Sequence, residues 1–273
     1  MTVSVIIPAF NRVDFLKKAI ESVLSQTYKD FELIIIDDGS EDDTPEMVSG
    51  FKDKIVYIKQ KRQGPAAARN AGIKASKGRY IAFLDSDDWW DKEKLSIQVN
   101  EMDKNPNYAV SHTEEKWYKD GKIFNQKRVH KKFHGYIFDK CLPLCVVSMS
   151  TALIKRELFN DTGLFDESLP CCEDYDFWLR VSARYPLLLI DKPLTLKDGG
   201  RKDQVSYIYR TGMDKFRIGS ITKILDMPKF LNGKQRKLAK RELAKKCRIY
   251  GNGCIKHNKP EEGAHYLSLP ERY

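Results

Sequence analysis

Short apolar runs alternate with helical segments through the first hundred residues of the chain. Runs rich in β-branched or aromatic residues predict buried strands at 3–7, 33–36, 55–58 and 80–84. The segments between them predict helices at 14–26, about 45–52 and 66–75. Strands that alternate with helices in this order are typical of an α/β fold, in which a largely parallel sheet carries helices on both faces.

The loops that follow these strands bring polar residues to one edge of the predicted sheet. Right-handed crossovers place such loops along the same edge, and ligands of open α/β sheets bind outside the carboxyl ends of the strands. The loop sequences are Ala9-Phe10-Asn11-Arg12, Asp37-Asp38-Gly39-Ser40 and Asp85-Ser86-Asp87-Asp88. Carboxylates that are far apart in the sequence are therefore expected to converge on one crevice.

The second part of the chain has a less regular pattern. Strands are predicted at 108–111, 149–154 and 187–190, and an amphipathic helix at 174–184. From about residue 203 the sequence predicts helices without strands, and Gly251 and Gly253 predict a bend between two of the last helices. No clear linker separates this tail from the rest, so we expect the tail to pack on the main domain.

Positive charge is concentrated in that tail. The 273 residues are 41% hydrophobic and 32% charged, which allows a packed core, and their net charge is +10. Residues 201–273 contain 18 Lys and Arg against 7 Asp and Glu, a net of +11, whereas residues 1–200 contain 30 against 31, a net of −1. Because no zinc-finger spacing or RNA-binding aromatic signature occurs, we expect no nucleic-acid partner. The tail is expected to dock on anionic lipids or on a partner, or to be a solvated helical face.

Targeting signals and cysteines bear on the location of the protein. No run of about 18 apolar residues predicts a membrane span, and residues 1–8 do not resemble a signal peptide, so a soluble cytoplasmic protein is expected. The six cysteines lack zinc-ligand spacing and fit a reducing compartment. Most are expected to be buried thiols, while Cys171 and Cys172 are expected to line a pocket beside Asp174.

The acidic pair Asp85 and Asp87 follows directly on a predicted strand. Two carboxylates one residue apart can face one hard cation, which takes its remaining oxygens from water and from a diphosphate. Taken by itself, an Asp-x-Asp tripeptide is more often a solvated loop or a cap of the next helix, which is predicted to begin near Asp91.

Asp38 and Arg69 are two further candidates. The carboxylate of Asp38 can accept hydrogen bonds from a ring N–H or from ribose hydroxyl groups, although Gly39 and Ser40 also suffice for a simple turn and helix cap. Arg69 follows a run of small side chains and can meet base or phosphate acceptors; the alternative is a packed helix with a surface arginine. The spacing of a phosphate-cradling P-loop is absent.

Five motifs follow one another between residues 3 and 200: SVIIPAFNR, DDGS, GPAAARNAG, FLDSDDWW and FDESLPCCEDYDFWLR. In order and spacing they resemble the family 2 glycosyltransferases, enzymes with the Rossmann-like GT-A fold. The resemblance implies a GT-A domain at 1–200, with a mixed, mostly parallel sheet, a nucleotide-sugar half at about 1–105 and an acceptor half at about 106–200. Residues 201–273 would be a basic helical extension packed on that domain.

The resemblance also implies which residues bind the donor. The loop Pro8-Ala9-Phe10-Asn11 would run beside the nucleotide, with Asp38 at the base and Arg69 near the base or the phosphates. Asp85 would approach the ribose. Asp87, with Asp85, would hold the Mg²⁺ or Mn²⁺ that bridges the diphosphate.

Asp174 matches the catalytic base of the family. It would take the proton of an acceptor hydroxyl as that oxygen attacks the anomeric carbon, a single displacement that inverts the anomeric configuration. Its place at the start of a predicted helix also favours an ionised carboxylate, because a helix N-terminus carries partial positive charge. The alternative is that Glu173 and Asp174 only complement the helix dipole.

One position departs from the family pattern. Many members have a histidine late in the domain that completes the metal site, and the matching stretch of this chain has Arg201 there. An arginine is always charged and cannot ligate a metal. The resemblance therefore leaves the third metal ligand open, and we expect Arg201 to pair with the diphosphate.

The sequence thus predicts an inverting, metal-dependent glycosyltransferase that acts in cell-surface polysaccharide or glycolipid synthesis. A UDP-sugar is the favoured donor, with GDP- and dTDP-sugars as alternatives. The acceptor is a saccharide or a lipid-linked hydroxyl, and the basic tail would bring the enzyme to the inner face of the membrane. One alternative is a sugar-phosphate nucleotidyltransferase, which would need a glycine-rich loop with a basic residue after the first strand. The other is a non-catalytic nucleotide-sugar binding module, against which the intact Asp174 and acidic loop speak.

Overall fold

The computed structural model of the protein describes residues 1–119, 121–125 and 128–273. In the first half the strands are β1 (Val3–Ala9), β2 (Phe31–Asp37), β3 (Val56–Lys59), β4 (Tyr80–Phe83) and β5 (Asp88–Trp90). The helices there are α1 (Val13–Leu24), α2 (Thr44–Ser49), α3 (Pro65–Ala75) and α4 (Lys94–Lys104). The predicted strands and helices of this half are confirmed to within three residues at either end.

The second half contains two long strands, one long helix and several short elements. Its strands are β6 (Val110–Lys119), β7 (Lys122–Phe124), β8 (Leu153–Lys155) and β9 (Leu187–Asp198). Its helices are α5 (Phe138–Cys141), α6 (Leu158–Thr162) and α7 (Glu173–Arg184), with 3-10 turns η1 (Arg128–His130) and η2 (Met149–Thr151). The tail consists of α8 (Val205–Ile208), α9 (Met213–Asp226), α10 (Gly233–Lys256), α11 (Pro260–Ser268) and the 3-10 turn η3 (Leu269–Arg272).

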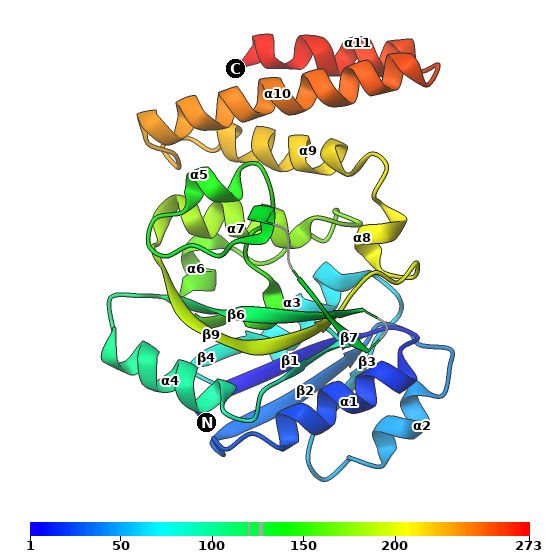
Figure 1. The fold of residues 1–273 in the computed structure, drawn as a ribbon, viewed down its shortest axis with the longest axis vertical. Coiled ribbons are helices and arrows are strands. Elements are labelled where there is room, and N and C mark those ends of the chain that lie inside the picture. The colour runs from blue at the N-terminus through cyan, green and yellow to red at the C-terminus, as the bar shows by residue number, and fades with distance from the viewer. Residues whose placement is uncertain (120, 126–127) are drawn as a thin grey trace.

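One mixed sheet runs through the molecule in the order β3-β2-β1-β4-β8-β6-β9-β5, with β7 paired to β6 (Figure 1). The pairs β1–β2, β1–β4, β2–β3 and β6–β9 are parallel, whereas β8 runs antiparallel to both of its neighbours. The helices α1 and α2 lie on one side of the sheet, and α5, α6 and α7 lie on the other. The predicted α/β fold with a mixed, mostly parallel sheet is confirmed.

The long pair β6–β9 was only partly predicted. β9 pairs with β6 as far as Asp198, and the register shifts around Glu114, where Pro193 lies opposite. Asp191, Lys192 and Pro193 interrupt the apolar run, which is why the pattern predicted an end at residue 190. A proline is tolerated in a strand at such an irregularity, because no regular ladder hydrogen bond is lost there. The predicted strand 149–154 was wrong in its first part, which forms η2.

The predicted bend at Gly251 and Gly253 was also wrong. Both residues lie within α10, and the chain turns after it, near Asn258. A Cβ atom on Gly251 would lie 2.9 Å from the carbonyl oxygen of Gly263 in α11, and one on Gly263 would lie 2.8 Å from that of Gly251. The glycines thus allow two helix backbones to pack closely.

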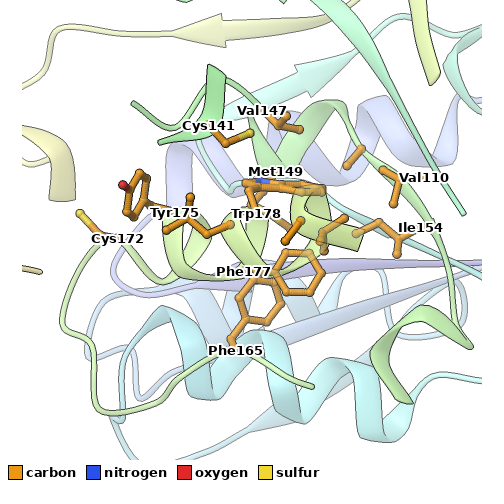
Figure 2. Close-up of a cluster of buried hydrophobic side chains, with 14 of the residues drawn as sticks. Val110, Cys141, Val147, Met149, Ile154, Phe165, Cys172, Tyr175, Phe177 and Trp178 are labelled. Atoms are coloured by element: carbon orange, nitrogen blue, oxygen red, sulfur yellow. The ribbon is translucent and has the colours of Figure 1, made fainter. Parts of the chain in front are cut away.

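Two apolar clusters cover the faces of the sheet. One packs α1 and α4 on the side chains of Val3, Val5 and Ile7. The other surrounds Trp178 and Phe177 of α7, which Figure 2 shows among side chains from several segments of the chain. This second cluster also includes residues of α9 and α10, which lie beyond α7 in Figure 1, so the tail shares the core of the α/β part.

None of the helices in the described part of the chain is both long enough and apolar enough to cross a membrane.

Candidate active site

A cavity of about 700 Å³ opens at the carboxyl ends of β1, β2 and β4. It is lined by every residue that the sequence predicted for the site except Arg201, namely Pro8, Ala9, Phe10, Asn11, Asp38, Arg69, Asp85, Asp87 and Asp174. Carboxylates from the loops after β2 and β4 and from the first turn of α7 thus face the same space.

Asp38 organises the wall of this cavity. Its Oδ1 accepts hydrogen bonds from Gln60 Nε2 (2.7 Å) and from the backbone N–H of Gln63 (2.9 Å), and its Oδ2 accepts one from the N–H of Gly64 (2.7 Å). These bonds fold residues 60–64 against the loop after β2. That segment carries Arg62, which the sequence analysis missed and whose guanidinium lies 3.9 Å from the ring centre of Phe10.

The expected turn after β2 is present, and the side chain of Asp37 closes it. Asp37 Oδ1 accepts a hydrogen bond from the N–H of Ser40 (2.7 Å), and Gly39 has φ of 84°, a value that glycine adopts without strain. Ser40 does not cap the next helix. Its hydroxyl instead accepts from the N–H of Asn11 (3.0 Å), which ties the loops after β1 and β2 together.

Arg69 is buried, so its interpretation as a surface arginine is wrong. It is 5% exposed, and its guanidinium pairs with Asp85 Oδ1 (2.8 Å) and Glu173 Oε1 (2.5 Å). Gly72 of the same helix explains the run of small residues, because a Cβ there would lie 2.4 Å from Ile6 Cγ2 in β1. α3 therefore packs closely on the sheet and carries Arg69 into a network that joins the two halves of the chain.

The network shifts the pKa values of its carboxyl groups in opposite directions. Burial raises the pKa of Asp85, but the charges of Arg69 and Lys197 outweigh it and hold the pKa below the ordinary value. Burial also raises the pKa of Glu173, and here Arg69 does not fully offset it. Arg69 and Lys197 together thus favour the ionised form of Asp85.

Arg201 contacts the acidic loop although it does not line the cavity. Its guanidinium lies 2.6 Å from Asp87 Oδ2 and within 3.4 Å of carboxylate oxygens of Asp198 and Asp203. Gln204 Nε2 also donates to Asp87 Oδ2 (3.0 Å). The segment at the start of the tail therefore folds over the loop after β4.

Asp88 is a buried member of the acidic loop, and no role in the site was predicted for it. It accepts a hydrogen bond from Ser150 Oγ (2.6 Å) and pairs with Lys197 Nζ (3.3 Å), so it holds the loop on η2 and β9. Burial raises the pKa of Asp88 well above its ordinary value, while Lys197 opposes this shift and Asp87 adds to it.

Asp174 lies in the first turn of α7, after Cys172 in a left-handed conformation with φ of 64°. Its Oδ1 accepts from the N–H of Tyr175 (2.7 Å), and its Oδ2 accepts from the thiol of Cys145 (3.3 Å). Burial and the charge of Asp174 raise the pKa of Cys145 well above its ordinary value, so this thiol stays protonated at neutral pH. Cys171 and Cys172 line the cavity, as expected, and Figure 2 shows Cys172 beside Tyr175.

The donor atoms of the acidic loop fit a magnesium or manganese ion only in part. Within residues 1–119, 121–125 and 128–273, no group of three His, Cys, Asp or Glu side chains could hold a metal ion. The chain can offer Asp85 and Asp87, and the described contacts with Arg69, Arg201 and Gln204 use only one oxygen of each. Two carboxylates suit an ion that keeps its waters and takes further oxygens from a diphosphate.

The tail contributes a part of the cavity that the sequence did not predict. Residues from the start of α8 to the second turn of α9 line it, including Gln204, Val205, Ile208, Met213 and Arg217. No motif marks these residues, and their helical pattern does not tell which face meets the cavity.

The architecture and the position of the cavity define a GT-A protein. The structure of TarS of S. aureus in complex with UDP superposes with a TM-score of 0.68 at 21% identity, over 92% of this chain and 72% of that one. The mannosyltransferase PcManGT from Pyrobaculum calidifontis in complex with GDP-Man and Mn2+ gives 0.68 at 15% identity, over 99% and 75%. At these identities the likeness establishes the fold.

The chain belongs to glycosyl transferase family 2, whose sequence model matches residues 4–163. An uncharacterized glycosyltransferase of Rickettsia felis is 42% identical over 225 residues, which are 80% of this chain but 36% of that protein. WfaP of Escherichia coli, named a UDP-Glc:alpha-D-GlcNAc-diphosphoundecaprenol beta-1,3-glucosyltransferase, is 36% identical over 67% of this chain and 70% of its own length. The chain thus spans little more than a third of the length of the Rickettsia relative.

Proposed function

We propose that this chain transfers a sugar from a nucleoside-diphosphate donor to a hydroxyl group of an acceptor, with inversion at the anomeric carbon. The observation that carries the proposal is the single cavity shared by Asp38, Asp85, Asp87 and Asp174. Membership in a glycosyltransferase family supports it and leaves the nucleotidyltransferase alternative without support.

A UDP-sugar is the favoured donor. The name of WfaP gives UDP-Glc as its donor, and TarS was solved in complex with UDP. PcManGT was solved with GDP-Man, so GDP- and dTDP-sugars remain alternatives. In this proposal the loop at Pro8–Asn11 and Asp38 face the nucleoside, and Asp85 approaches the ribose. Nη2 of Arg69 pairs with Asp85 and Nη1 pairs with Glu173. In this proposal Arg69 therefore acts on the donor through Asp85.

A divalent cation is proposed on Asp87, with Asp85 as its neighbour. When bound, Mg²⁺ or Mn²⁺ supplies positive charge that stabilises the leaving diphosphate. Arg201 is proposed to contact the same phosphates, because its guanidinium lies beside Asp87. It would have to exchange its pairs with Asp198 and Asp203, whose distances of 3.4 and 3.3 Å are long, for the phosphate oxygens. Arg201→Ala should therefore weaken donor binding, and unchanged donor affinity would contradict this role.

Asp174 is proposed as the base. Tyr175 and Cys145 hold one carboxylate oxygen each, which fixes the orientation of the group at the start of α7. The carboxylate takes the proton of the acceptor hydroxyl as that oxygen forms its bond to the anomeric carbon and the bond to the diphosphate breaks.

We further propose that residues 201–273 form a basic extension of a GT-A domain at 1–200 and bring the enzyme to anionic lipid. Five exposed cations at a spacing of three or four lie along one side of α10, and we call them the basic face: Lys234, Lys237, Arg241, Lys245 and Arg248. The opposite side, with Ala239, Leu243 and Cys247, is buried. An acceptor linked to a membrane lipid, like the one in the name of WfaP, fits such a location.

The donor is tested by thermal shift with UDP-, GDP- and dTDP-sugars, each with and without Mn²⁺. One nucleotide class should raise the melting temperature, more strongly with the metal. Stabilisation by none of them would contradict the proposed function.

The basic face is tested with vesicles that contain phosphatidylglycerol. The triple variant Lys237→Glu, Arg241→Glu and Lys245→Glu should lose a salt-sensitive binding that the unaltered protein shows. A matched control reverses three exposed lysines elsewhere, Lys52, Lys54 and Lys74. Equal binding of both variants, or no binding of the unaltered protein, would mean that the basic face is only a solvated surface.

A further inference from the structure

We infer that the end of the cavity formed by α8 and α9 is the acceptor subsite, and that Arg217 binds a phosphate group of the acceptor there. The inference rests on the proposed function and adds the part of the cavity and the residue that bind the lipid-linked acceptor. The acceptor is an apolar chain joined to the accepting sugar through a phosphate or diphosphate.

The α8–α9 segment lies near both the proposed metal ligand Asp87 and the proposed base Asp174. Gln204, just before α8, donates to Asp87 Oδ2 (3.0 Å). Arg217, in the second turn of α9, has its guanidinium carbon 6.0 Å from the ring centre of Tyr175, the neighbour of Asp174. A molecule bound along this segment can therefore present a hydroxyl to Asp174 while the donor occupies the loops after β1, β2 and β4.

The lining of this end is partly apolar. Val205 and Ile208 are 43% and 59% exposed, although both are large hydrophobic residues that line the cavity. Met213 adds a flexible thioether beside them. Exposed apolar residues at the mouth of a polar cavity indicate a ligand with an apolar part, whose binding removes this surface from water.

Arg217 has unused capacity for an anion. Its Nη1 donates to Asp214 (3.2 Å) and its Nη2 to the sulfur of Met213 (3.0 Å), a weak acceptor. Its Nε is buried and has no hydrogen-bond partner among the described residues. Asp214 is also paired with Lys246 (3.2 Å), so one carboxylate serves two cations.

The other paired cations of the cavity wall differ in the position of the carboxylates with which they pair. Arg12, Arg69 and Lys197 pair with carboxylates that line the cavity itself, namely Asp203, Asp85 and Asp88. The partner of Arg217 lies outside the lining and is shared. A half-buried guanidinium with donors left over is suited to a phosphate, whose oxygens it can meet bidentately.

The test measures the binding of geranyl diphosphate, which combines an apolar chain with a diphosphate, to protein saturated with UDP. Saturation keeps the probe out of the donor's phosphate site. We expect calorimetry to show binding of geranyl diphosphate and none of geraniol. Arg217→Gln should weaken the binding about tenfold or more, as expected for the loss of a charge-assisted hydrogen bond.

Two further variants complete the test. Arg210→Gln makes the same change at an exposed arginine outside the cavity and should bind the probe like the unaltered protein. Arg217→Lys keeps the charge without the planar fork and should retain an intermediate affinity, while an unchanged melting temperature shows that the fold is intact.

Failure of the inference can be told from failure of the proposed function. If UDP binds but geranyl diphosphate does not, or binds equally to Arg217→Gln, the acceptor subsite is wrong while the proposed function stands. If Arg217→Gln weakens UDP instead, Arg217 belongs to the donor site and the inference is overturned. If no nucleotide binds, the proposed function fails, and binding of the probe to the free protein still decides the role of Arg217.

Discussion

The proposed donor side of the cavity, formed by the loops after β1, β2 and β4, differs from the side formed by α7 in how its carboxylates are held. Asp38 accepts three hydrogen bonds, while Asp85 and Asp87 each pair with an arginine. Asp174 accepts from an amide and a thiol, and no cation pairs with it within 4 Å in the described part of the chain. On the proposed donor side Asp85 and Asp87 are thus held by charge and Asp38 by neutral hydrogen-bond donors, whereas Asp174 is oriented without being neutralised, which suits its proposed role as proton acceptor.

The largest effect is expected from Asp174→Asn. The amide keeps the shape of the side chain but cannot take a proton, so the rate of sugar transfer should fall by about 10²–10⁴. Donor binding, measured by thermal shift, should be unchanged. Loss of donor binding together with transfer would mean that Asp174 belongs to the donor side.

Asp87→Asn tests the opposite side. Removing the charge should weaken donor binding in Mn²⁺ by about tenfold or more, because a carboxylate ligand is lost and Arg201 keeps only its pairs with Asp198 and Asp203. Asp139→Asn, at an exposed position on α5, is the matched control. The assay is titration of the favoured UDP-sugar at fixed Mn²⁺; equal affinities of the two variants would remove Asp87 from the donor site.

Arg201→His replaces a charged guanidinium by an imidazole that can ligate a metal ion, and so tests whether residue 201 lies within reach of the ion. A neutral imidazole beside Asp87 can coordinate Mn²⁺, so in the presence of UDP the affinity for Mn²⁺ should rise by about tenfold, measured by the electron paramagnetic resonance signal of the free ion. Arg210→His controls for histidine at the surface. An affinity equal to that of the unaltered protein would show that residue 201 does not reach the ion.

The smallest effect concerns Cys145. Burial and the charge of Asp174 raise the pKa of this thiol, so iodoacetamide should modify it slowly at pH 7 and faster as the pH rises. In Asp174→Asn the charge is gone and the pKa should fall, which should speed modification several-fold at the same pH. Peptide mass spectrometry follows Cys145, with the buried Cys247 as internal control. Equal rates in both proteins would contradict contact between the two side chains.

Sequence reasoning reached the donor side more fully than the other side. The ends of β1, β2 and β4 could be predicted from the sequence, because a buried strand is a short apolar run. The polar residues after such a run must lie at the edge of the sheet. Which partner each carboxylate takes is not readable, because Arg201 reaches Asp87 across more than a hundred residues. The hydrogen bonds of Asp38 likewise depend on how residues 60–64 fold.

The second side was predicted only where a motif marks it. Asp174 belongs to the motif FDESLPCCEDYDFWLR. Cys145 lies in a loop and Arg217 in α9, and which of their side chains face the cavity depends on packing. Gly251 shows the same limit, since a glycine that separates helices and one that lets them touch have the same pattern. The roles of the site residues remain predictions that the variants above test.

The bridge Asp85–Arg69–Glu173, in which Arg69 and Glu173 are buried, has a consequence for chimeric enzymes. Arg69 and Asp85 come from residues 1–105, and Glu173 comes from residues 106–200. An exchange of residues 106–200 with a relative that lacks a carboxylate at position 173 would bury an arginine with only one of its two partners. Breaking a buried ion pair in this way costs about 3–5 kcal/mol. A graft of residues 106–200 therefore keeps this bridge only if it has a carboxylate at position 173 and the host has Arg69 and Asp85.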